Sequence, residues 1–152
     1  MKQKADILIA DISDIAEIAA IEKECIPNGW SEKSFSDWLQ NKNTVIFKAV
    51  QNGIIIGFAN GSWVLDEAEL LNIAVVEKSR RNGIAQMLFD ALENYFKEQN
   101  AEKIFLEVRE KNQSAINFYE KNGFEKNGLR KNYYSNPTDN GVLMMKNINT
   151  GE

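Results

Sequence analysis

Glu107 is the first side chain whose type and position suit proton transfer. It stands in Leu106-Glu107-Val108-Arg109, where the alternate residues Ile104, Leu106 and Val108 are apolar. Period two places Glu107 on the opposite face of a strand from these residues. An acid in such a strand is most often part of a solvated ion pair, here with Arg109. We expect the helices on either side of this strand to cover both of its faces, and a covered carboxylate has a raised pKa suited to base chemistry.

Tyr119 is the second candidate. Asn112, Ala115 and Tyr119 are spaced i, i+3 and i+7, which places them on one helical face, whereas Phe118 and Phe124 point elsewhere and resemble core residues. Taken alone, Tyr119 is most simply an amphipathic core tyrosine. Its phenol, with a reference pKa of about 10, can also donate a proton to a departing thiolate with a reference pKa of about 8.5.

A basic loop is the third candidate. Residues 78–85 lie between a strand that ends near Val76 and a long amphipathic helix, and they include Lys78, Arg80, Arg81 and Gly83. Free N–H groups at a helix start, with a glycine beside them, can bind a phosphate. The same residues also fit an ordinary solvated helix start. The loop is neither a Walker loop nor a three-glycine dinucleotide fingerprint.

The hydropathy pattern predicts the scaffold for these residues. Apolar residues with period 2 or 3.6 give the order β-α-α-β-β-β-α-β-α-β-β, so we expect an α/β (α+β) fold with a mixed sheet of about seven strands and helices on both faces. We expect one domain over 1–148 with a tail at 149–152. The expected strands are 6–10, 44–50, 54–64, 67–76, 103–108, one from 124 and 142–146; the expected helices begin near Ile15, after the N-cap Ser31, at Arg81 (to about Gln99) and at residue 113 (to 122).

Local signals mark the ends of these elements. Trp30 and Phe35 have hydrophobic-staple spacing around Ser31, and Asn52-Gly53 is a two-residue hairpin signal. Asn112 occupies an N-cap position and Gly123 a helix stop. We expect a loop over Ser135–Gly141.

Composition excludes several classes of site. The 152 residues include no histidine, which rules out a Ser-His-Asp triad or a His-ligated metal site, and a single cysteine, Cys25, which rules out an internal disulfide. We expect no metal. The net charge of −4 argues against a general nucleic-acid binder. With no signal-peptide pattern and no apolar run of about 18 residues, we expect a cytoplasmic protein without a membrane segment.

Taken together, these segments resemble the GCN5-related N-acetyltransferase (GNAT) superfamily over nearly the whole chain. Their joint occurrence in this order is far more specific than any one of them. The matching segments are Leu71-Asn72-Ile73-Ala74-Val75 for the central strand, Arg80-x-x-Gly83-x-Ala85 for the pyrophosphate loop and Asn112…Ala115…Tyr119…Gly123-Phe124 for the following helix.

Within the superfamily the chain is most similar to the bacterial ribosomal-protein-alanine N-acetyltransferases. The similarity rests on residues 30–35, 64–68, 106–109 and 130–134. The resemblance implies acetyl transfer from acetyl-CoA to a protein N-terminus, with Glu107 as general base and Tyr119 as general acid. It also implies a set of residues that bind the co-substrate: Ile73, Ala74, Val75, Arg81, Asn82, Gly83, Ile84, Ala85, Gln86, Asn112 and Tyr119.

The chain departs from this pattern in two places. Val76-Glu77-Lys78 stands where a proline is common, and Asp139-Asn140-Gly141 replaces an acidic pair near the acceptor site. Some superfamily members take their base from the central strand, so Glu69 is an alternative to Glu107, which could itself act directly or through a water. Two other functions remain open: acetylation of a small amine such as a polyamine or an antibiotic, and a non-catalytic acyl-CoA-binding module. A nucleotide-binding regulatory domain is disfavoured, because no ribose-binding acid or Walker lysine accompanies the loop at Arg80–Ala85.

Overall fold

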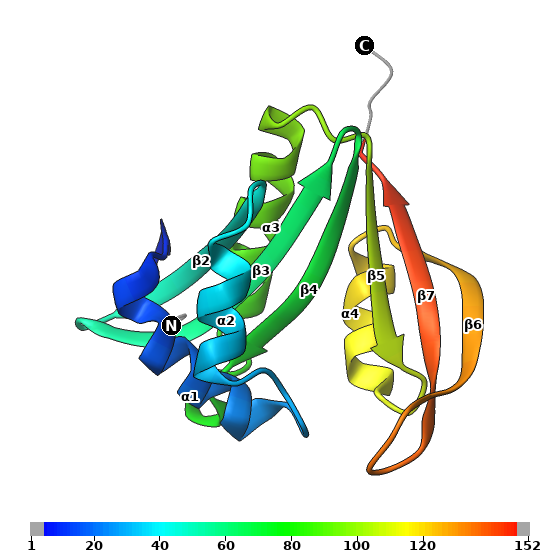
Figure 1. Ribbon diagram of the computed structural model, residues 1–152, viewed down its shortest axis with the longest axis horizontal. Coiled ribbons are helices and arrows are strands. Elements are labelled where there is room, and N and C mark those ends of the chain that lie inside the picture. The colour runs from blue at the N-terminus through cyan, green and yellow to red at the C-terminus, as the bar shows by residue number, and fades with distance from the viewer. Residues whose placement is uncertain (1–4, 149–152) are drawn as a thin grey trace.

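A mixed seven-stranded sheet organises the computed structural model, which describes residues 5–148. Its strand order is β1-β2-β3-β4-β5-β7-β6, with β4 and β5 parallel and every other neighbouring pair antiparallel. The expected element order is confirmed (Figure 1). The strands are β1 (Asp6–Ile9), β2 (Thr44–Gln51), β3 (Ile54–Val64), β4 (Glu67–Val75), β5 (Lys103–Arg109), β6 (Glu125–Tyr134) and β7 (Asp139–Asn147). The expected tail, residues 149–152, and the first four residues of the expected domain lie outside the described residues.

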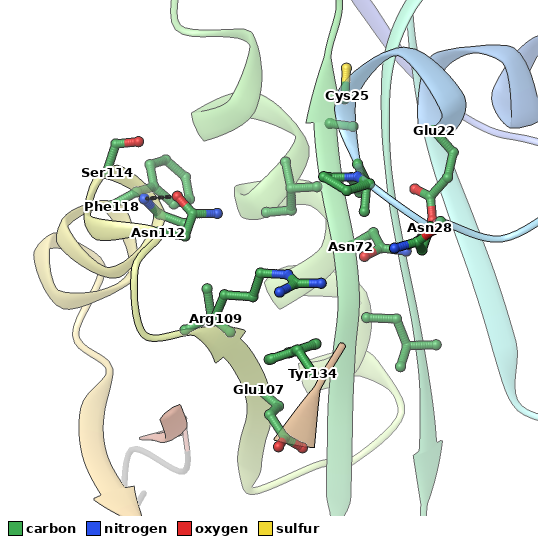
Figure 2. Close-up of a pocket in the computed structure, with 18 of the residues that line it drawn as sticks. Glu22, Cys25, Asn28, Asn72, Glu107, Arg109, Asn112, Ser114, Phe118 and Tyr134 are labelled. Carbon is green, nitrogen blue, oxygen red and sulfur yellow. Dashed lines mark hydrogen bonds between the residues drawn. The ribbon is translucent and has the colours of Figure 1, made fainter. Parts of the chain in front are cut away.

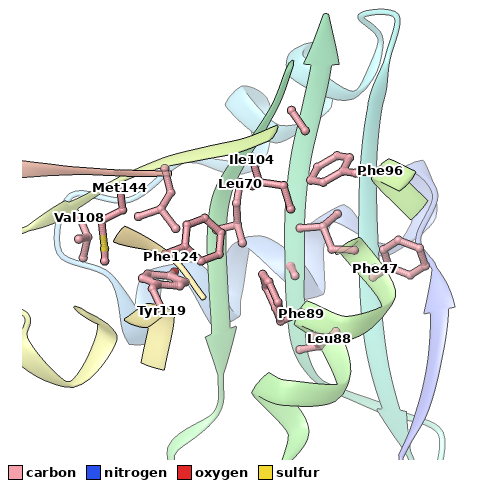
Figure 3. Packing of buried hydrophobic residues seen from close by; sticks show 14 of the residues in the cluster. Phe47, Leu70, Leu88, Phe89, Phe96, Ile104, Val108, Tyr119, Phe124 and Met144 are labelled. Carbon is pink, nitrogen blue, oxygen red and sulfur yellow. The ribbon is translucent and has the colours of Figure 1, made fainter. Parts of the chain in front are cut away.

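Helices cover both faces of the sheet, as the sequence predicts. On one face α1 (Ile15–Cys25) and α2 (Glu32–Leu39) bury a cluster that includes Ile18, Phe35 and Phe58. On the other face α3 (Ile84–Glu98) and α4 (Gln113–Lys121) bury a larger cluster, part of which is drawn in Figure 3. Single-turn 3₁₀ helices, Ile12–Asp14 and Glu77–Ser79, precede α1 and α3.

The residues predicted to mark the starts and ends of the helices do so. The Oγ of Ser31 accepts a hydrogen bond from the Ser34 N–H at 3.1 Å, and the rings of Trp30 and Phe35 lie 5.1 Å apart, so the hydrophobic staple is present. The Oδ1 of Asn112 accepts from the Ala115 N–H and caps α4. Gly123, with a φ of 96°, follows the last residues of that helix.

Two expected boundaries are wrong. Helix α3 begins at Ile84 rather than at Arg81, because Arg81 and Gly83 have φ values of 68° and 79°, which no α-helix contains. The last strand begins at Asp139 rather than at 142, because the Tyr134↔Asp139 pair closes the β6–β7 hairpin and leaves only residues 135–138 as a loop.

Strands β4 and β5 separate along their length, and this separation opens the sheet. They pair only from Glu67↔Lys103 to Glu69↔Phe105, at one end of each strand. Just beyond, β4 carries a bulge: Asn60 on β3 faces Asn72, whereas Gly61 faces Leu70, so Leu71 has no partner. A bulge bends a strand and increases its twist. The remaining parts of β4 and β5 therefore diverge, as Figure 1 shows.

Candidate active site

A cavity of about 970 Å³ lies where β4 and β5 diverge. Its walls come from the α1–α2 loop (residues 26–31), the second half of β4, the end of β5, the start of α4 and the end of β6. Figure 2 shows Glu22 and Asn28 on the α1 side of this cavity and Asn112, Ser114 and Phe118 on the α4 side. Its volume is at the upper end of the range typical of small-molecule sites.

Glu107 borders this cavity from β5. Its Oε2 is buried, has no hydrogen-bond partner among the described residues, and lies 3.6 Å from the Nε of the largely exposed Arg130. Gly141 on β7 leaves space for this carboxylate, because a Cβ there would collide with it. A carboxylate that borders a cavity can accept a proton from a group bound there.

The expected reason for the burial of Glu107 is wrong. The two helices that flank β5, α3 and α4, both pack on the face that carries Leu106 and Val108. Within residues 5–148, neither of these helices covers the face of Glu107, because the two helices belong to successive crossovers that pack on one side of the sheet. The strands β6 and β7 enclose this side chain instead, through Arg130 and Gly141.

Tyr119 also borders the cavity, and its ring forms part of the core. The residue is 8% exposed, and its ring packs edge-on against Phe118 and against Phe124, the second of which Figure 3 shows beside it. Burial raises the pKa of Tyr119 strongly, and Tyr134 raises it further. The hydroxyl therefore stays protonated across the physiological pH range. Phe118, expected in the core with Phe124, is only partly buried and lines the cavity.

Glu69, the alternative base, lies outside this cavity. It is on β4 opposite Phe105 and borders a separate hollow with Ser62 and Glu67. Burial raises the pKa of Glu69, the charge of Glu107 raises it further, and Arg130 lowers it. Of the two carboxylates, only Glu107 lines the larger cavity.

The free edge of β4 faces the cavity at Ile73 and Val75. The Val76 N–H donates to the Ile56 carbonyl on β3, and backbone groups alternate between the two edges of a strand. Ile73 and Val75 therefore direct their N–H and C=O groups toward β5, where no strand of residues 5–148 pairs with them. Ala74 has the opposite alternation, so its backbone groups point to Phe58 on β3.

Arg80 and Cys25 meet at the end of this edge. The Nε of Arg80 donates to the Val75 carbonyl at 2.9 Å, and the Cys25 thiol donates to the same oxygen at 3.5 Å. The Nη2 of Arg80 lies 3.4 Å from the sulfur. Burial raises the pKa of the Cys25 thiol. These contacts tie α1 to the loop before α3.

The basic loop lies at the rim of the cavity. Arg80 and Ala85 of this loop border the cavity. The other residues expected to bind the co-substrate here, Arg81, Asn82, Gly83, Ile84 and the following Gln86, do not. Gly83 offers no side-chain cap to α3, so the first N–H groups of this helix have no partner within it, and a Cβ at Gly83 would meet nothing within 4 Å. The Gln86 amide is paired with that of Asn122.

Several residues that line the cavity escaped the sequence analysis. Arg109 donates to the carbonyl oxygens of Ser135 and Pro137 and so holds the β6–β7 loop. Asn28 donates from the opposite wall to the Asn136 carbonyl at 3.2 Å. The Asn28 contact joins segments 108 residues apart and the Arg109 contacts join segments 26 and 28 residues apart, so no local pattern predicts them. For Glu22, which is buried beside the α1–α2 loop, the sequence does contain a signal that could have identified it: a charged residue on the apolar face of a helix.

Comparison with known proteins agrees with this arrangement. Residues 15–124 match the acetyltransferase (GNAT) family. The chain belongs to the GNAT family. It is 36% identical over 131 residues, or 86% of each chain, to a ribosomal protein bS18-alanine N-acetyltransferase of Escherichia coli K12. It is 31% identical over 151 residues to a putative enzyme of the same name from Bacillus subtilis 168, covering 98% of this chain and 99% of the other.

The fold comparison gives the same family. The crystal structure of the ribosomal-protein-S18-alanine N-acetyltransferase from Escherichia coli superposes with a TM-score of 0.90 at 32% identity, covering 97% of this chain and 96% of the other. The expected GNAT-type fold is confirmed. This GNAT protein is an acyltransferase that uses acetyl-CoA as its acetyl donor.

The GNAT site fits this donor. The unpaired edge at Ile73 and Val75 can form strand-like hydrogen bonds with the amides of a pantetheine arm. The open α3 N-terminus at Gly83 suits a pyrophosphate. Asn112 borders the same cavity from α4. Within residues 5–148, no cluster of histidine, cysteine or acidic residues is arranged to hold a metal ion, and no helix there is long and apolar enough to cross a membrane.

Proposed function

We propose that this protein transfers the acetyl group of acetyl-CoA to the N-terminal α-amine of a protein, specifically an N-terminal alanine of a small-subunit ribosomal protein. One observation carries the proposal: Glu107 and Tyr119 border one cavity, beside the unpaired edge of β4. The relatives from Escherichia coli and Bacillus subtilis, which carry the name of a bS18-alanine N-acetyltransferase, support this acceptor.

Glu107 prepares the acceptor. An α-amino group has a reference pKa of about 7.7–8.0 and is mostly protonated at neutral pH, so it must lose a proton before it can attack a thioester. The Glu107 carboxylate, which borders the cavity, takes this proton directly or through a water. The Nε of Arg130 lies 3.6 Å from the Oε2 of this carboxylate.

Val75 and Tyr119 act on the donor side. As the new C–N bond forms, negative charge develops on the thioester oxygen, and the free N–H of Val75 is placed to stabilise it. When the C–S bond breaks, Tyr119 gives its proton to the sulfur. Burial makes this phenol a weak acid. The same dry surroundings also raise the proton affinity of the thiolate, which keeps the transfer feasible.

A substrate panel tests this function. Thiol release from acetyl-CoA is measured with peptides that begin with the N-terminal sequence of a small-subunit ribosomal protein, with the same peptides already acetylated, and with polyamines and aminoglycosides. We expect thiol release with the free peptide alone. Release with the small amines alone would assign the activity to that class, and acetyl-CoA binding without release for any amine would indicate a regulatory module.

The cellular acceptor is tested by mass spectrometry. Cells that lack this gene should contain a small-subunit ribosomal protein with a free N-terminal alanine, which the restored gene acetylates again. Because ribosomal proteins and acetyl-CoA meet in the cytoplasm, we place the enzyme there. An unchanged set of N-termini would contradict the proposed acceptor.

A further inference from the structure

Glu22 is a buried carboxylate that has no part in the proposed proton transfers. It lies on α1, its side chain borders the cavity, and the residue is 1% exposed. Acidic residues are rarely buried to this extent without a cationic partner. Within residues 5–148 no lysine or arginine forms an ion pair with Glu22. Its position therefore requires another explanation.

One oxygen of Glu22 joins two walls of the cavity. Its Oε2 accepts a hydrogen bond from the Trp30 N–H at 3.0 Å and another from the Nδ2 of Asn72 at 3.2 Å. Trp30 belongs to the α1–α2 loop, which forms one wall, and Asn72 directly follows the bulge residue Leu71 on β4. The carboxylate thus connects the loop with the strand edge at the point where that edge begins to diverge from β5.

Gly29 shows how closely the loop lies on this carboxylate. A Cβ at Gly29 would lie 2.6 Å from the Cγ of Glu22 and 2.9 Å from its Cδ, distances that no Cβ adopts. A glycine is therefore required at this position because there is no room for a Cβ beside Glu22, and not because the backbone is left-handed. The loop and the carboxylate fit each other as one unit.

The second oxygen of Glu22 is enclosed by protein. Oε1 is buried without a hydrogen bond among the described residues, and Asn60, whose side-chain amide is equally buried and unpaired, lies on β3 opposite Asn72. An oxygen in this position cannot touch an incoming amine. Glu22 must therefore influence the reaction through the residues that it holds.

We propose that Glu22 is a positioning residue that fixes the α1–α2 loop against the β4 bulge and thereby sets the place of the acceptor amine relative to the thioester. The inference rests on the proposed function, because it assigns the loop to the acceptor. The residues that alternate with Ile73 and Val75, namely Ala74 and Val76, bond to β3, so the edge that faces acetyl-CoA does not depend on Glu22.

Steady-state kinetics with the ribosomal peptide test this role. Glu22→Ala removes both hydrogen bonds, and we expect the KM for the peptide to rise at least fivefold while the KM for acetyl-CoA changes less than twofold. Glu22→Gln keeps an oxygen that accepts both bonds, so it should restore the peptide KM to within twofold of wild type. Glu17→Ala, at an exposed position on the same helix, is the matched control and should change neither constant.

Gly29→Ala provides a second, independent variant. It leaves the carboxylate in place but forces the loop away from it, so it should raise the peptide KM as Glu22→Ala does. This variant decides the proposal if Glu22→Ala does not fold. An equal rise in both KM values, or a loss of kcat alone, would overturn the positioning role.

Hydrogen–deuterium exchange separates this inference from the proposed function. The amides of residues 26–31 should exchange at least tenfold faster in Glu22→Ala than in wild type, with exchange in β3 unchanged. If wild type acetylates no peptide but the loop exchanges faster in Glu22→Ala, the proposed acceptor is wrong, whereas the role of Glu22 in holding the loop is supported. Unchanged exchange of the loop would overturn the inference whatever the acceptor.

Discussion

The guanidinium of Arg109 lies 4.4 Å from the ring centroid of Tyr134 and also donates to the carbonyl oxygens of Ser135 and Pro137. One side chain at the end of β5 thus holds both the end of β6 and the β6–β7 loop. A planar guanidinium can make these contacts together, whereas a lysine ammonium cannot. We expect Arg109→Lys to raise the KM for a peptide acceptor about fivefold, the equivalent of about 1 kcal/mol. Steady-state kinetics would show this, and an equal rise in the KM for acetyl-CoA would contradict it.

Tyr119→Phe removes the proposed acid and leaves the ring contacts with Phe118 and Phe124 intact. We expect kcat to fall about a hundredfold or more, the usual contribution of general acid catalysis, with unchanged affinity for acetyl-CoA. Tyr95→Phe on α3, whose ring packs on Phe47 and Trp63, is the matched control and should keep full activity. Wild-type turnover in Tyr119→Phe would remove its acid role.

Glu107→Gln removes the proposed base. The loss of rate should be greatest at low pH, where the acceptor amine is protonated, and should shrink as the pH rises past about 8, where the amine loses its proton unaided. The pH profile of kcat/KM measures this. Glu69→Gln, which changes a carboxylate outside the larger cavity, should retain most of the activity. A wild-type profile for Glu107→Gln together with loss of activity in Glu69→Gln would move the base to Glu69.

Gly83→Ala tests the proposed pyrophosphate site. At a φ of 79° an alanine costs about 1–2 kcal/mol of stability, and its Cβ would meet no protein atom within 4 Å. Any loss of acetyl-CoA affinity then reports contact with the bound molecule, and we expect at least a tenfold loss by calorimetry. Gly53→Ala, at a φ of 77° in the β2–β3 turn and also without neighbours, should lose similar stability without losing affinity.

Glu22 should also make stability depend on pH. Burial raises the pKa of Glu22 in the folded protein, although the hydrogen bond from Trp30 opposes this. Below the ordinary glutamate pKa of about 4.3, Glu22 is protonated in both the folded and the unfolded protein. As the pH rises above this value, the unfolded chain loses the proton first. Ionisation therefore stabilises the unfolded state and lowers the free energy of unfolding. Glu22→Gln lacks this titration. Its stability relative to wild type should therefore increase from pH 4 to 7, by at most about 1.4 kcal/mol per pH unit in urea denaturation. A constant difference would contradict this.

The sequence by itself determined the elements and the chemistry that they carry. The alternation around Glu107, the helical spacing of Asn112 and Tyr119 and the Asn52-Gly53 turn are local patterns, and local backbone preferences and one-sided burial are enough to produce them. The absence of histidine restricted proton transfer to carboxylates, tyrosine, lysine or water. These signals placed most element boundaries within a few residues of those observed.

The tertiary structure decided where the cavity lies and what surrounds its residues. The bulge at Leu71 separates β4 from β5, α3 and α4 pack on one face and leave Glu107 to β6 and β7, and the backbone of Ile73 and Val75, but not of Ala74, faces the opening. Glu22, Arg109 and Asn28 act across contacts between 8 and 108 residues apart. Such contacts depend on how whole layers pack against each other, which no local pattern in the chain encodes.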